Sequence, residues 1–158
     1  MRQSTALKSM GSKTTLHIVA GFKGAGKTTY INNNLLICGK KAAVLLNEHG
    51  ATSIREGFTV RDLKSGCPCC DGARFFIRDL QNFYYEFTPE EIVVELSSFA
   101  NLEEMYRIMQ HRFSLRFLSS VRYYYVINTK TISSRELISG PFINTQLQYA
   151  DSVILTRH

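Results

Sequence analysis

Residues 21–29 of this chain read Gly21-Phe22-Lys23-Gly24-Ala25-Gly26-Lys27-Thr28-Thr29, and this stretch decides the fold. It matches the phosphate-loop pattern G-x-x-x-x-G-K-[ST] at every required position. Glycines let the backbone turn tightly and bring its N–H groups close to phosphate oxygens. Lys27 would then reach the β- and γ-phosphates, and the Thr28 hydroxyl would hold Mg²⁺. We therefore predict a nucleoside triphosphate site formed by Gly21, Lys23, Gly24, Ala25, Gly26, Lys27, Thr28 and Thr29.

The sequence on both sides of this loop supports the match. Residues 16–20 predict a short buried strand before the loop, and residues 29–36 predict a helix after it. The loop would then lie at a helix N-terminus, where anions are favoured. The alternative is a chance glycine-rich turn, which a complete motif between a strand and a helix does not favour.

Strand and helix patterns alternate along the rest of the chain. Apolar and β-branched runs predict strands at 42–46, 92–96, 121–127 and 152–155. Helical spacing predicts helices at 73–85, 101–111, 133–138 and 143–149, the second with Asn101 as its N-cap. Segment 51–64 has a weak pattern, and we expect a loop there with a short helical or strand turn. The alternation predicts an α/β protein with the three-layer P-loop NTPase fold, a mostly parallel central sheet flanked by helices.

The composition is typical of a soluble globular protein. The chain has 158 residues, of which 44% are hydrophobic and 20% charged, so we expect one domain with a substantial core. No apolar run approaches the roughly 20 residues that span a bilayer. The polar N-terminus lacks the apolar region of a secretory signal. We expect residues 1–13 to be a disordered lead-in and residues 14–158 to be a single P-loop domain.

The net charge of +6 raises the question of a nucleic-acid partner. The basic residues are scattered along the chain and do not form one run, and the nucleotide proposed above is itself a polyanion. The charge pattern therefore does not favour nucleic-acid binding.

Three of the four cysteines, Cys67, Cys69 and Cys70, fall within four residues. Neighbours this close rarely form a disulfide framework, so we expect a reducing cytoplasm. Thiolates in one loop suit zinc, copper(I) or a related ion, but three sulfurs do not complete a tetrahedral site. The fourth ligand would be Glu48, His49, water or a second molecule, and the alternative is three thiols that hold no metal.

Two further residues can be placed from their position in the sequence. Glu95 ends an apolar strand, where a carboxylate in an α/β sheet faces the ligand crevice, although a solvated strand end is the simpler alternative. Cys38 stands alone near the end of the first helix, and we expect it to be a small buried apolar residue.

Four motifs occur in order and carry a resemblance to a known family: Gly21 to Thr29, Asn47-Glu48-His49-Gly50, Gly66-Cys67-Pro68-Cys69-Cys70 and Glu95-Leu96-Ser97-Ser98-Phe99-Ala100. A weaker fifth match covers residues 148–155. The chain resembles the CobW-like GTPases, a metallochaperone group of SIMIBI-class P-loop NTPases related to the urease and hydrogenase nickel-insertion GTPases. The resemblance extends over residues 16–158, and the Gly-Cys-x-Cys-Cys element is its most specific part.

The resemblance implies a slow GTP hydrolase that acts as a nucleotide-dependent chaperone for zinc or cobalt and delivers metal to a client protein. It implies that Lys27 and Glu95 are catalytic and that Mg²⁺ is bound by Thr28, Glu48 and Glu95. The cysteine cluster would hold zinc or a related transition metal between the two switch segments, with metal occupancy coupled to the nucleotide.

The chain also departs from the family pattern. Ala51 and Arg55 stand where the family has a glutamate and an aspartate, Ser98 replaces a glycine, and Asn128 replaces an aspartate. The Asn-Lys-x-Asp motif that recognises guanine does not follow Leu155, and the family's C-terminal domain is not expected. The sequence therefore does not decide between GTP and ATP.

Two other functions stay open at this point. One is a degenerate nucleotide- or metal-binding module without turnover, which the departures favour. The other is an ATP-using small-molecule kinase or ATPase, although no arginine-rich lid segment stands out. The metal, the client protein and the oligomeric state are not determined by the sequence.

Overall fold

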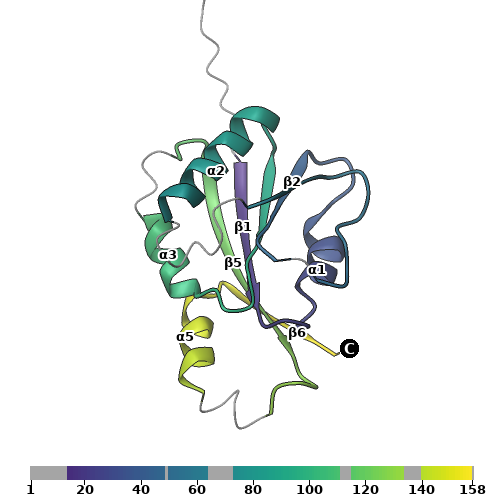
Figure 1. Ribbon diagram of the computed structural model, residues 1–158, viewed down its shortest axis with the longest axis vertical. Coiled ribbons are helices and arrows are strands. Elements are labelled where there is room, and N and C mark those ends of the chain that lie inside the picture. The colour runs from purple at the N-terminus through teal and green to yellow at the C-terminus, as the bar shows by residue number, and fades with distance from the viewer. Residues whose placement is uncertain (1–13, 49, 64–72, 111–114, 134–139, 158) are drawn as a thin grey trace, which may run out of the picture.

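The computed structural model describes residues 14–48, 50–63, 73–110, 115–133 and 140–157. These residues contain a six-stranded sheet with the strand order β3-β2-β4-β1-β5-β6 (Figure 1). Every pairing in the sheet is parallel. The strands are β1 (Thr14–Gly21), β2 (Ala42–Leu46), β3 (Thr59–Asp62), β4 (Glu91–Glu95), β5 (Leu118–Asn128) and β6 (Ser152–Thr156).

Helices cover both faces of this sheet. The short helix α1 (Lys27–Tyr30) continues as a π-helical turn, η1 (Ile31–Leu35), on one side. The helices α2 (Ala73–Phe87), α3 (Leu102–Gln110) and α5 (Pro141–Tyr149) lie on the other side (Figure 1). The predicted fold class, a three-layer α/β protein of the P-loop NTPase type, is confirmed.

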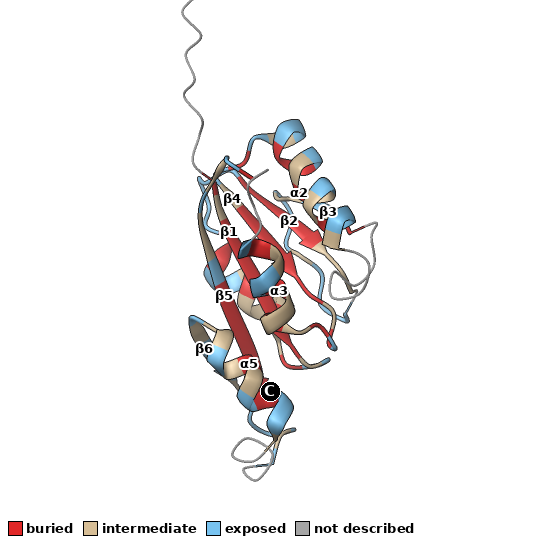
Figure 2. Ribbon diagram, turned by 90° about the vertical axis from the view of Figure 1, so that its left-hand side faces the viewer, coloured by how far each residue is buried: buried red, intermediate tan, exposed pale blue. Residues whose placement is uncertain are grey.

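The core forms two apolar layers because neighbouring residues of a strand point to opposite faces. In β1, Ile18 packs into the layer beneath α2 and α3, and Val19 packs into the layer beneath α1. Tyr123 and Tyr125 of β5 pack with the first layer and Tyr124 with the second. Figure 2 shows buried residues along the central strands and more exposed ones on β6.

The edge strand β3 is a feature that the sequence did not predict as a separate strand. Among the described residues it pairs with β2 alone, from Ala43↔Thr59 to Leu46↔Asp62. Its residues alternate between half-buried and exposed positions, so it carries no apolar run. Main-chain hydrogen bonds to β2 therefore define this strand, and the pattern of side chains along the sequence does not predict such bonds.

The prediction for Cys38 is wrong, because this side chain is exposed. The helical turns end at Leu35, and Leu36 already has an extended backbone. The chain then turns through Gly39, which has a positive φ of 91°. Cys38 therefore lies in a surface turn and does not pack against the sheet.

The start of α3 is capped as predicted. The Asn101 side-chain oxygen accepts a hydrogen bond from the amide of Glu103 at 2.9 Å. Gln146 of α5 accepts a second bond, from the amide of Leu102 at 2.7 Å, and its own amide group donates to Asn101 at 3.1 Å. These bonds satisfy the open N–H groups of α3 and join it to α5.

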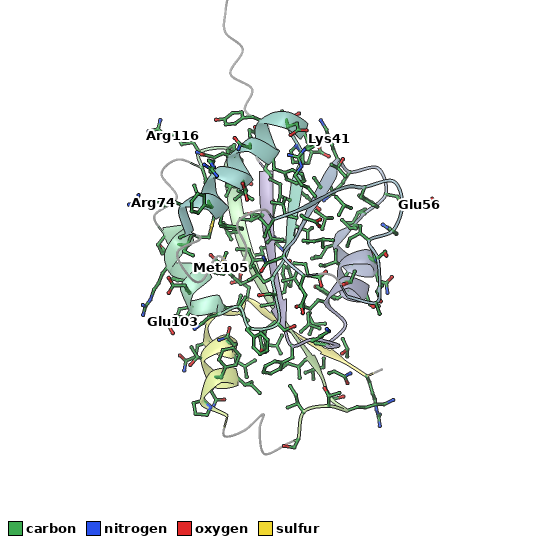
Figure 3. The ribbon with its side chains drawn as sticks, viewed as in Figure 1. Lys41, Glu56, Arg74, Glu103, Met105 and Arg116 are labelled. Atoms are coloured by element: carbon green, nitrogen blue, oxygen red, sulfur yellow. The ribbon has the colours of Figure 1, made fainter. Side chains whose placement is uncertain are left out.

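Charged side chains lie around the outside of the molecule. Lys41, Arg74 and Arg116 come from three separate parts of the chain and point outward at separate places (Figure 3). Within the described residues, no helix combines the length and the apolar character that crossing a bilayer requires.

We expect Gly21→Ala to lower the free energy of unfolding by at least about 2 kcal/mol. Gly21 has φ of +144°, and a Cβ there would lie 2.4 Å from the carbonyl oxygen of Val126 in β5. Both the backbone strain and the close approach to β5 would resist the methyl group. Urea denaturation would measure the change.

Gly50→Ala is the matched control, since a Cβ at Gly50 meets no described heavy atom within 4 Å. Equal losses of stability in the two variants would contradict the role assigned to Gly21.

Candidate functional site

The site lies where the carboxyl ends of three neighbouring strands meet. Glu95 of β4 is aligned with Val19 of β1 on one side and with Leu46 of β2 on the other. Because the strands are parallel, the loop after β1, the turn after β2 and the end of β4 reach the same edge of the sheet. Residues far apart in the sequence are thereby brought together.

The loop after β1 turns tightly and leads into α1. Gly24 and Gly26 have positive φ angles of 75° and 92°. The amide of Ala25 donates to the carbonyl of Phe22 at 3.1 Å, and the first helical bond runs from Tyr30 to Gly26 at 2.9 Å. The backbone of a phosphate loop therefore lies at the start of a helix, as the motif predicted.

The Lys27 side chain folds back over this loop. Its ammonium group donates to the carbonyl of Gly21 at 2.8 Å and to the carbonyl of Phe22 at 3.3 Å. Burial lowers the pKa of Lys27, and the negative charges of Glu95 and Glu48 act in the opposite direction. The buried cation therefore lies in the field of two carboxylates.

Thr28 and Glu95 form a direct pair beside the loop. The Thr28 hydroxyl lies 3.0 Å from each carboxylate oxygen of Glu95 and donates to this group. Glu95 is buried, and its carbonyl also accepts a hydrogen bond from the amide of Asn47 at 3.0 Å. Two of the three residues that were predicted to bind Mg²⁺ are thus in direct contact.

The third residue, Glu48, is held by Ser98 instead. One carboxylate oxygen of Glu48 accepts the Ser98 amide at 2.8 Å and the Ser98 hydroxyl at 2.7 Å. Burial acts to raise the pKa of Glu48, but these two bonds and the positive charges of Lys27 and Lys23 outweigh it and hold the pKa below its usual value. The carboxylate form is therefore the favoured one.

These groups surround a cavity of about 310 Å³. The predicted nucleotide-binding residues from Lys23 to Thr29 line it, and so do Glu48 and Glu95. Gly21 does not line it and instead supplies a carbonyl to Lys27. Gly50 to Thr52 also line the cavity, although the sequence motifs did not point to them as site residues; their position just after β2 was the available signal.

The ends of β5 and β6 support the loop from the other side. Asn128, at the end of β5, donates to the carbonyl of Gly24 at 3.4 Å. The Thr156 hydroxyl, at the end of β6, donates to the carbonyl of Ala25 at 2.7 Å. Both residues fix the loop backbone through its carbonyl groups.

The predicted transition-metal ligands Cys67, Cys69 and Cys70 lie outside the described residues, and so does His49. Among the described residues, no group of three His, Cys, Asp or Glu side chains is placed to hold a metal ion. The cysteine metal site therefore stays a prediction.

Comparison with known protein families agrees with the site described above, which has a phosphate loop, a helix after it and a carboxylate at the end of β4. The nucleotide-binding domain described as CobW/HypB/UreG matches residues 15–158. The chain belongs to this family. The resemblance stated from the sequence motifs is therefore confirmed.

One curated relative is a zinc chaperone CobW from Sinorhizobium sp, which is 32% identical over 110 residues. That alignment covers 61% of this chain and 31% of the relative. The chain therefore spans about a third of the length of the relative that it matches.

Solved structures share the fold of this chain at low sequence identity. A zinc-bound triple mutant of the YjiA GTPase matches with a TM-score of 0.65 and 18% identity, covering 92% of this chain and 49% of the other. Zinc-bound YjiA from E. coli matches with a TM-score of 0.61 and 18% identity, covering 90% of this chain and 49% of the other. FtsY from Mycoplasma mycoides matches with a TM-score of 0.52 and 14% identity, covering 90% of this chain and 52% of the other. At these identities the likeness shows the fold alone.

Proposed function

We propose that this chain binds GTP with Mg²⁺, hydrolyses it slowly and uses the nucleotide state to control a transition metal. The observation that carries the proposal is the cavity in which Lys27 and the Thr28–Glu95 pair meet at a complete phosphate loop. Membership of the CobW/HypB/UreG family supports nucleotide binding. The catalytic roles are assigned to Lys27 and Glu95.

The donor groups beside the loop fit Mg²⁺. The Thr28 hydroxyl and the Glu95 carboxylate are hard oxygen ligands 3.0 Å apart, the donor type that Mg²⁺ takes together with phosphate oxygens. When bound, the ion would neutralise charge on the phosphates. In our proposal Thr28 and Glu95 hold it, and Glu48 lines the same cavity with its carboxylate on Ser98.

Lys27 would act by exchanging its hydrogen-bond partners. Its ammonium group now donates to two carbonyls of its own loop, and phosphate oxygens would replace these neutral acceptors with charged ones. Phosphoryl transfer needs such positioning and charge stabilisation more than covalent chemistry. Burial strengthens the attraction because little water screens it.

The metal part of the proposal rests on the three clustered cysteines and on a relative described as a zinc chaperone. Cys67, Cys69 and Cys70 would bind zinc or a related ion as thiolates, and a client protein would receive the metal. Reduced thiols imply a reducing compartment, and the cytoplasm is the location we propose.

A nucleotide-binding module without turnover is the second candidate. Ala51 and Asn128 replace family carboxylates, and Ser98 holds Glu48 by two short bonds that a glycine would not supply together. Loss of turnover would leave nucleotide and metal binding as the function.

We expect Lys27→Ala to weaken binding of GTP by at least about tenfold, since charge-assisted hydrogen bonds contribute about 1.5–3 kcal/mol each. Isothermal calorimetry would measure the affinity. Lys41→Ala is the control, because this exposed lysine bonds to Thr88 at the opposite end of the sheet. Equal GTP affinity in the wild type and in Lys27→Ala would refute nucleotide binding at this loop.

We expect single-turnover hydrolysis of GTP to require Mg²⁺ and to fall at least about tenfold in Glu95→Gln, the order of loss that follows removal of one electrostatic contact in the transition state. Glu91→Gln is the matched control, since Glu91 lies at the other end of β4 and pairs with Lys40. The single-turnover rate would be measured for both zinc-loaded and zinc-free protein.

The same assay with ATP tests the choice of base. Comparison of the rates with GTP and ATP shows whether the chain hydrogen-bonds one base, because a site with such partners rejects the wrong base by a large factor. Absence of turnover with either nucleotide, in protein that binds both, would favour the second candidate.

We expect zinc affinity to differ between protein bound to a GTP analogue, protein bound to GDP and nucleotide-free protein. If the sites are coupled, zinc must tighten nucleotide binding by the same factor. Thiolate binding releases protons, so zinc affinity should also fall as the pH is lowered. A competition titration with a chromogenic chelator would measure it.

Cys69→Ser should weaken zinc binding, whereas Cys38→Ser should not, because Cys38 is an exposed cysteine outside the cluster. Identical zinc affinities in all three nucleotide states would show a metal site without a switch.

A further inference from the structure

Ser98 binds Glu48 with both of its hydrogen-bond donors. The amide and the hydroxyl reach the same carboxylate oxygen at 2.8 Å and 2.7 Å, and Ser98 is buried. Hydrogen bonds to a charged acceptor are short and roughly twice as strong as neutral ones. A second contact joins the same segments, since the amide of Ser97 donates to the side chain of Asn47 at 3.3 Å. The turn after β2 is therefore tied to the turn after β4.

The Glu48 carboxylate lies in the field of the phosphate loop. It lines the same cavity as Lys27 and Thr28. Its charge acts on Lys27, and the charges of Lys27 and Lys23 act on it in return. An anion is thus already present among the cations that would receive the phosphates. The terminal phosphate of a triphosphate brings negative charge into this same field and would repel the carboxylate.

We propose that Glu48 is an internal substitute for the terminal phosphate and that the Ser98 hydroxyl sets how strongly the chain prefers triphosphate over diphosphate. This inference rests on the proposed nucleotide binding. In the closed state Ser98 holds Glu48, as seen here. A terminal phosphate displaces Glu48 from Ser98, whereas a diphosphate, which lacks that charge, leaves the contact intact.

The surroundings leave room for this displacement. Glu48 also lines a second cavity of about 280 Å³, whose wall includes Leu46, Ile54 and Val60. The residue after Ser98, Phe99, is 84% exposed, so this side chain loses little packing when the turn moves. Opening breaks the Ser98–Glu48 contact, and the strength of this contact therefore subtracts from the affinity for a triphosphate.

Ser98→Ala tests the proposal because it removes the hydroxyl and keeps the amide. We expect affinity for guanylyl imidodiphosphate, a non-hydrolysable GTP analogue, to rise by about tenfold or more, the order of effect of losing one hydrogen bond to a charged group. Affinity for GDP should stay unchanged. A fall in analogue affinity would mean that the hydroxyl binds the phosphate directly, and it would overturn the proposal.

Two further variants make the test specific. Ser97→Ala is the neighbouring control, since Ser97 reaches Asn47 through its backbone amide, which the substitution keeps. In a Glu48→Gln background, the effect of Ser98→Ala should largely disappear, because the competing charge is gone. An undiminished effect in that background would show that the hydroxyl acts through another group and would also overturn the proposal.

Phe99→Trp supplies a direct signal of opening, because the chain contains no tryptophan. Emission should change when the GTP analogue binds and not when GDP binds. Equal emission with both nucleotides, under conditions where calorimetry shows both bound, would show that the contact stays closed. Failure of GDP to bind to any variant or to the wild type would refute the proposed function, and this inference with it.

Discussion

The position of β4 between β1 and β2 is the constraint on which the site depends. Parallel pairing aligns Val19, Glu95 and Leu46 across three strands. This alignment brings the phosphate loop, the Glu95 carboxylate and the turn that holds Glu48 to one edge of the sheet. A sheet with β1 next to β2 would separate Glu95 from Thr28. The strand order therefore determines which side chains meet at the site.

Charge is the second constraint. Lys27 and Glu95 are both buried, and burying a charge is costly unless opposite charge or hydrogen bonds compensate for it. Here Lys27 donates hydrogen bonds to two carbonyls. Glu95 accepts a hydrogen bond from the Thr28 hydroxyl, and Glu48 accepts hydrogen bonds from Ser98. Each charged group has a protein partner that a charged ligand or an ion can replace. The contacts of the site are therefore of the kind that ligand binding exchanges.

The sequence predicted those parts of the structure that depend on local patterns. The phosphate loop, the buried strands and the Asn101 cap follow from residue types at short spacing, and all three are confirmed. The strand β3 was missed because pairing with β2 defines it. The contact between Ser98 and Glu48 was missed for a related reason, since 50 residues separate its partners. Ser98 stood out in the sequence only as a departure from a family pattern.

The edge strand also bears on the coupling proposed between metal and nucleotide. β3 is parallel to β2, so its carboxyl end points to the edge of the sheet that carries the site. The amide of Leu63, the residue after β3, donates to the carbonyl of Leu46 at 2.7 Å. Leu46 lies two residues before Glu48, and Leu63 is the last described residue before the cysteine segment. This hydrogen bond joins the end of β3 to the end of β2, the strand that precedes Glu48.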